Sequence, residues 1–142
     1  MKIVGYLLVI FVALSVSDAG AEECTKLEAY AAETVTDYLD SWRNMNLGYT
    51  QFKHCDDGSI GEGFSEAAAR LFVDQWGRLS QFQQYALKNP SFEKFVLSHI
   101  DATLNVKDLK KMQVLAETAC PTVNRALCVK IAERSKAAQA DQ

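Results

Sequence analysis

The spacing of apolar residues constrains the fold of this chain more than any other feature. From residue 27 onward they recur at steps of three and four, and no segment alternates apolar and polar residues over a useful length. Such steps place side chains on one face of an α-helix, whereas a half-buried strand needs strict alternation. Short glycine-turned hairpins and internal repeats are also absent from the sequence. The sequence therefore predicts an all-α protein.

The same spacing predicts about six short-to-medium helices. Asn89 caps the fourth helix and Pro90 occupies its first turn, where a missing amide proton costs nothing. Asn105 caps the fifth helix, and the tail 136–142 is expected to fray. Short links favour a compact, mostly antiparallel bundle. The predicted apolar stripes span residues 27–45, 64–76, 79–87, 92–104, 109–116 and 123–131.

Residues 46–63 interrupt this pattern and are expected to form the one substantial loop. Four of the seven glycines of the chain lie there, and loops of such composition often carry function. If Tyr49, Phe52 and Ile60 are exposed together, they form an apolar patch suited to gripping a partner. If they pack under the loop, they form its own small core. The candidate binding residues in this segment are Tyr49, Phe52, Asp56, Asp57 and Glu62.

The N-terminus is typical of a secretory signal peptide. Lys2 precedes an apolar run over residues 3–14, and a small-x-small cleavage site occupies residues 19–21. The run is shorter than the roughly 18 to 20 apolar residues that a membrane-spanning helix needs. We therefore expect residues 1–21 to be removed and 22–142 to form a single periplasmic or secreted domain without a stable membrane anchor.

The four cysteines, Cys24, Cys55, Cys120 and Cys128, predict two disulfides in an exported chain. Three pairings are open. If Cys120 and Cys128 stand on one helix, eight residues separate their Cα atoms by roughly 12 Å, beyond the ~7 Å limit for a disulfide. This favours pairing each of them with Cys24 or Cys55. A non-helical start around Cys120 and Pro121 weakens the objection.

Charge is spread unevenly along the chain, whose formal net charge is −3. Residues 22–76 hold eleven acidic and four basic residues, whereas 77–142 hold six acidic and ten basic residues. A nucleic-acid binder usually has a strongly basic domain or stripe, so we expect no nucleic-acid partner. The acidic half is suited to attracting a basic protein, although a solvated helical surface explains the same charge more simply.

No metal or cofactor is expected. The glycines at 58 and 61 do not fit a calcium-binding loop, because neither register supplies acids at its third and fifth positions. Zinc would need further ligands beside His54 and Cys55, yet the cysteines are expected to be oxidised. The other histidine, His99, lies on an apolar stripe beside Phe95 and Val96 and is expected to be a hydrogen-bonded core residue.

Signatures of nucleophilic catalysis are also missing. The chain has no G-x-S-x-G or C-x-x-C motif, and a serine triad would have to recruit His54 or His99 without supporting sequence. A hydrolase that uses two carboxylates is conceivable, with Asp57 and Glu62 as acid and base across a cleft. Nothing in the sequence sets their separation.

The leading hypothesis is a non-enzymatic exported protein-binding module, such as an inhibitor or immunity-type factor, that presents the loop 46–63 to another exported protein. In general design, an exported, disulfide-linked, all-helical chain of this size is similar to periplasmic immunity proteins that neutralise cell-wall-degrading toxins. That likeness covers no motif and assigns no residue. The alternatives are a small cell-envelope hydrolase that uses the loop carboxylates and a structural envelope protein without a discrete site.

Overall fold

The computed structural model describes residues 23–142, which form seven α-helices and three short 3-10 turns without a strand. The all-α prediction is confirmed. The predicted signal peptide, residues 1–21, lies outside the described residues. The helices are α1 (Lys26–Thr36), α2 (Trp42–Phe52), α3 (Gly58–Asp74), α4 (Leu79–Lys88), α5 (Pro90–Ser98), α6 (Val106–Thr118) and α7 (Arg125–Ala140), with turns η1 (Lys53–Cys55), η2 (Trp76–Arg78) and η3 (Thr122–Asn124).

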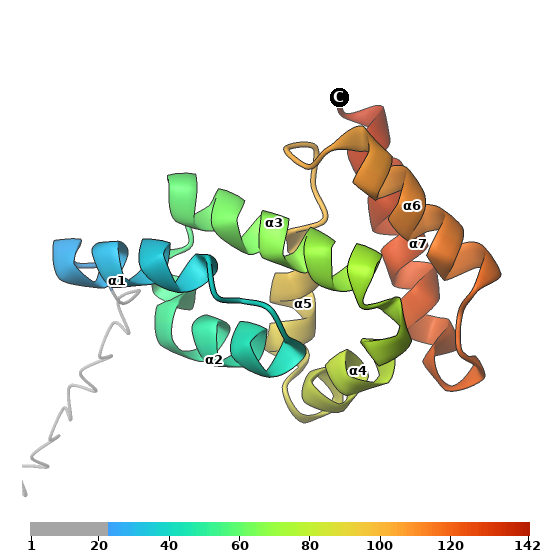
Figure 1. Ribbon diagram of the computed structural model, residues 1–142, viewed down its shortest axis with the longest axis horizontal. Coiled ribbons are helices and arrows are strands. Elements are labelled where there is room, and N and C mark those ends of the chain that lie inside the picture. The colour runs from blue at the N-terminus through green and yellow to red at the C-terminus, as the bar shows by residue number, and fades with distance from the viewer. Residues whose placement is uncertain (1–22) are drawn as a thin grey trace, which may run out of the picture.

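The longest helix, α3, organises the bundle. It runs across the middle of the molecule and contacts α1, α2, α5 and α6 (Figure 1). Helices α1 and α2 lie at one end, whereas α6 and α7 pack side by side at the other. Within the described part of the chain, no helix is long and apolar enough to cross a membrane.

The single helix expected over residues 27–45 is in fact two, so that prediction is wrong. Ser41 adopts an extended conformation, and its side chain accepts a hydrogen bond from the Asn44 N–H, which starts α2. The chain reverses before it and buries Leu39 at 1% exposure. The predicted stripe therefore does not form a continuous core face, and three of its members are largely exposed: Leu27, Tyr30 and Tyr38.

The prediction of a long loop over residues 46–63 is also wrong, because α2 continues to Phe52 and α3 begins at Gly58. Two of its glycines instead let helices approach closely. A Cβ added at Gly63 would lie 2.6 Å from the Thr36 side chain on α1, and one at Gly48 would lie 2.9 Å from Leu39. Only Gly58, at φ +52°, has the positive φ that a turn glycine supplies.

For the other helices, the predicted starts agree with the structure better than the predicted ends do. Asn89 caps α5 with Pro90 in its first turn, and the Asn105 side chain accepts from the Lys107 N–H at the start of α6. The fourth expected helix ends at Ser98 rather than 104. Val123 is 74% exposed rather than buried, because it lies in η3, ahead of the start of α7. Helix α7 continues to Ala140, where fraying was expected.

Two disulfides join Cys24 to Cys55 and Cys120 to Cys128. The number is as predicted, but the favoured pairing between the two ends of the domain is wrong. Cys120 does not share a helix with Cys128: it follows α6, and the chain turns through Pro121 and η3 before α7 begins. This turn brings the Cα atoms of Cys120 and Cys128 to 6.1 Å, within reach of a disulfide.

Candidate functional site

The five residues expected to form a binding loop are separated in the structure. Tyr49 is 6% exposed and packs with its ring centroid 5.3 Å from that of Phe92 and 4.9 Å from that of Phe95. Ile60 is also buried, and Phe52 is partly buried against the core. No exposed patch of Tyr49, Phe52 and Ile60 exists, because α2 and α3 turn these side chains inward.

The two loop aspartates have local roles. Asp57 caps α3, its carboxylate accepting a hydrogen bond from the Gly58 N–H at 2.8 Å. Asp56 points toward the bundle, and its Oδ2 atom lies 3.3 Å from His99 Nε2. Neither residue lines a groove or pocket described below.

His99 belongs to a polar network that the sequence did not reveal. Its Nδ1 atom lies 2.9 Å from Ser65 Oγ, and Ser65 donates to Asp101 Oδ2 at 3.0 Å. Asp101 in turn accepts from the backbone N–H and the hydroxyl of Thr103. The network joins the link before α3, α3 itself and the link between α5 and α6. His99 is thus a buried, hydrogen-bonded residue, as its position on an apolar stripe predicted.

Asp56, His99 and Ser65 are connected in the order of a catalytic triad, but their surroundings differ from those of one. A nucleophilic serine must reach its substrate and pass its proton to the histidine. Ser65 is 3% exposed and His99 6%, and the Ser65 hydroxyl is directed toward Asp101. The geometry therefore fits a structural role for this network. Only tertiary packing brings Ser65 and His99 together, so no local sequence signal points to the pair.

A groove of about 630 Å³ lies between α3 and the start of α6. Its α3 wall carries Glu62, Glu66, Arg70 and Asp74, which lie four residues apart and therefore share one helix face. The opposite wall includes Thr103, Asn105 and Asp108, and apolar side chains also line the groove: Ala69, Val73 and Leu104. Of the predicted site residues, only Glu62 lies here. The four-residue spacing was the sequence signal for Glu66, Arg70 and Asp74.

The groove has an excess of negative charge. Four carboxylates and one guanidinium line it. Arg70 Nη1 lies 4.0 Å from Glu66 Oε2, and Lys111 Nζ lies 4.0 Å from Asp74 Oδ1, both pairs being well exposed. Long, exposed pairs of this kind contribute little, so the carboxylates remain available to a positively charged partner.

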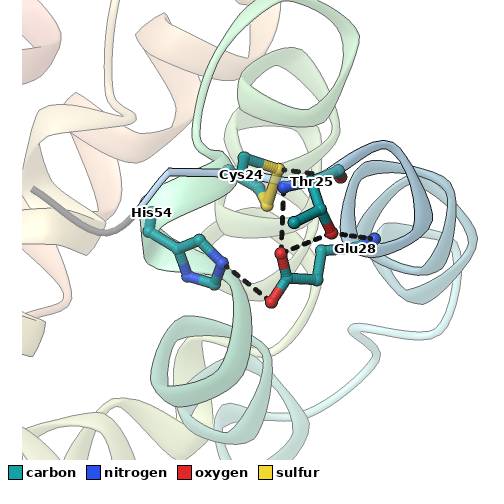
Figure 2. The surroundings of a disulfide bond; sticks show 5 residues. Cys24, Thr25, Glu28 and His54 are labelled. Carbon is teal, nitrogen blue, oxygen red and sulfur yellow. Dashed lines mark hydrogen bonds and ion pairs between the residues drawn. A yellow bond between two sulfur atoms is a disulfide. The ribbon is translucent and has the colours of Figure 1, made fainter.

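Another cluster surrounds the Cys24–Cys55 disulfide (Figure 2). Glu28 accepts hydrogen bonds from the Thr25 hydroxyl and the Thr25 N–H, and its Oε1 atom lies 3.5 Å from His54 Nε2. The Thr25 hydrogen bonds, with a smaller contribution from His54, hold the pKa of Glu28 below its usual value. One ring nitrogen of His54 and the two sulfurs all lie within 4.8 Å of one another.

Comparisons with protein-family models, with curated proteins and with solved structures find no match for this chain. Any functional assignment therefore depends on the groove and on the cluster around the Cys24–Cys55 disulfide.

Proposed function

We propose that this protein is an exported, non-enzymatic protein-binding module whose acidic groove between α3 and α6 binds a basic segment of another exported protein. An inhibitor or immunity-type factor is a protein of this kind. The observation that carries the proposal is the groove itself: four carboxylates and a single arginine line a cavity of about 630 Å³. The predicted signal peptide supports export, and the two disulfides fit an oxidising location.

The walls of the groove suit a lysine or arginine side chain. Ala69, Val73 and Leu104 offer apolar contact to the methylene stem, while Glu62 and Asp108 can meet the charged end. Because α3 and α6 are helices that pack on each other, the carboxylates are held on a preformed surface. Charge of one sign also steers an oppositely charged partner, so we expect salt to slow association.

The hydrolase alternative receives less support. It required Asp57 and Glu62 to face each other across one cleft, yet Glu62 lines the groove and Asp57 caps α3 outside it. Zymography of the mature protein on peptidoglycan separates the two proposals. We expect no clearing at any pH, and clearing that Glu62→Gln abolishes would replace the binding proposal by the hydrolase.

The binding proposal is tested by capture from a periplasmic extract with mature protein carrying residues 22–142, followed by affinity measurement with the purified captured protein. We expect Glu62→Gln/Glu66→Gln to weaken binding at least about tenfold at physiological salt. The control, Asp37→Asn/Asp141→Asn, removes the same charge from exposed helix ends outside the groove and should retain affinity. Equal affinities of the two double variants would contradict the groove assignment.

A further inference from the structure

The two disulfides have similar exposure but different neighbours. Cys24 and Cys120 are each partly exposed, whereas their partners Cys55 and Cys128 are each 2% exposed. Within residues 23–142, a group of at least three histidine, cysteine or acidic side chains close enough to share an ion occurs only at Cys24, His54 and Cys55. The Cys120–Cys128 bridge has no comparable imidazole, so it serves as an internal reference.

We propose that the Cys24–Cys55 disulfide is active in thiol–disulfide exchange with dithiols, that His54 is its proton donor and acceptor, and that Glu28 is a positioning residue for His54. This activity is separate from the proposed binding function and does not depend on it.

Exposure sets the direction of attack. The incoming thiolate reaches Cys24, which is partly exposed, more readily than Cys55, which is buried. The leaving sulfur is therefore Cys55, and a thiolate formed there is poorly hydrated. An imidazolium nearby stabilises such a thiolate or gives it a proton, and either effect makes it a better leaving group. The His54 side chain is 11% exposed, and one of its ring nitrogens lies within 4.8 Å of both sulfurs.

The exchange conserves atoms and electrons. A thiolate of the dithiol bonds to Cys24 Sγ, the Cys24–Cys55 bond breaks, and its electron pair goes to Cys55 Sγ, which takes a proton from the His54 imidazolium. The neutral His54 imidazole then accepts the proton of the second thiol of the dithiol. The resulting thiolate attacks the mixed disulfide, and Cys24 leaves as a thiolate that takes this proton from His54. The dithiol becomes a disulfide, and Cys24 and Cys55 become two thiols.

Glu28 has the contacts that a positioning residue needs. The first turn of α1 holds its carboxylate in place, because Thr25 and Glu28 form a reciprocal capping box. The Oε1 atom of this fixed carboxylate lies 3.5 Å from His54 Nε2, where it orients the ring (Figure 2).

The test follows the reduction of both bridges in the folded mature protein by dithiothreitol at pH 7, with alkylation quenching and mass spectrometry. We expect Cys24–Cys55 to be reduced at least about tenfold faster than Cys120–Cys128, and His54→Gln to remove most of this difference while leaving the Cys120–Cys128 rate unchanged. Glu28→Gln, which retains capping-box hydrogen bonding, should give a smaller decrease.

A pH profile distinguishes proton transfer from simple access. Thiolate attack accelerates with pH in every variant, so the informative quantity is the wild-type rate divided by the His54→Gln rate. This ratio should fall as pH is raised from 5 to 8, the range in which histidine loses its charge. Equal rates for the two bridges, or a ratio that does not change with pH, would make Cys24–Cys55 an ordinary crosslink.

Discussion

The two ends of the molecule are crosslinked in different ways. Cys24–Cys55 joins positions 31 residues apart and fastens the start of α1 to η1, whereas Cys120–Cys128 closes an eight-residue connection between α6 and α7. Helices α6 and α7 already pack along each other. Helix α1 leaves Leu27 and Tyr30 more than 70% exposed. The first bridge therefore compensates for limited packing at the start of α1, while the second reinforces a hairpin that packing already holds.

The largest expected effect on stability comes from removing each disulfide in turn, which tests this comparison directly. Loop-closure entropy alone predicts that Cys24→Ala/Cys55→Ala lowers the free energy of unfolding by about 3.7 kcal/mol and Cys120→Ala/Cys128→Ala by about 2.5 kcal/mol. Urea denaturation followed by circular dichroism measures both. A larger loss for the C-terminal pair would reverse the comparison.

The His99 network tests whether polar contacts hold the bundle together between these ends. His99→Leu leaves Asp56 and the buried Ser65 hydroxyl without their ring partner, so we expect a loss of about 1–3 kcal/mol. Ser98→Ala is the control, because the exposed Ser98 hydroxyl bonds only within its own helix. Equal midpoints in urea for the two variants would show that the network contributes no net stability.

Close packing of α1 on α3 is tested at Gly63. The added methyl group of Gly63→Ala would meet Thr36 at 2.6 Å, so α1 must shift at a cost of about 1–3 kcal/mol. Gly77→Ala is a suitable control, since nothing lies within 4 Å of an added Cβ there. Thermal unfolding compares them. If both variants are equally stable, α1 is held more loosely than the structure shows.

The smallest expected effect concerns pH. At the N-terminal end, hydrogen bonds from Thr25 are the main cause that lowers the pKa of Glu28 from its ordinary value of 4.5. At the C-terminal end, a hydrogen bond from Lys136 is the main cause that lowers the pKa of Glu117 from the same value. A lowered pKa in the folded state means that stability is present above 4.5 and is lost as pH falls through the folded value.

Glu28→Gln and Glu117→Gln should each flatten the decline of stability below pH 4.5. Because the Glu117 contact includes a charged amine and the leading Glu28 contact is neutral, salt should reduce the Glu117 contribution more. Unfolding midpoints measured from pH 3 to 6 at two salt concentrations check this. The same salt response at both sites would contradict the distinction.

Local chemistry explains most of what was predicted correctly. The apolar spacing indicated helices, Asn89 and Asn105 marked two helix starts, and an even number of cysteines indicated two bridges. These signals act over a few residues. The candidate site was predicted less well: only one of the five proposed residues, Glu62, lines the groove. Tyr49 is buried, since α2 extends through it and a loop of glycines turned out to be helical.

The sequence by itself determined the helical class, the capped helix starts and the number of disulfides, because propensity, capping and apolar period are properties of neighbouring residues. Tertiary structure alone decided which cysteines pair, where the first expected helix breaks, and that His99 meets Ser65 and Asp56. It also brought Asp108 opposite the acidic face of α3. Each of these depends on distances between segments far apart in the chain, which are set by how whole helices pack and which no local pattern records.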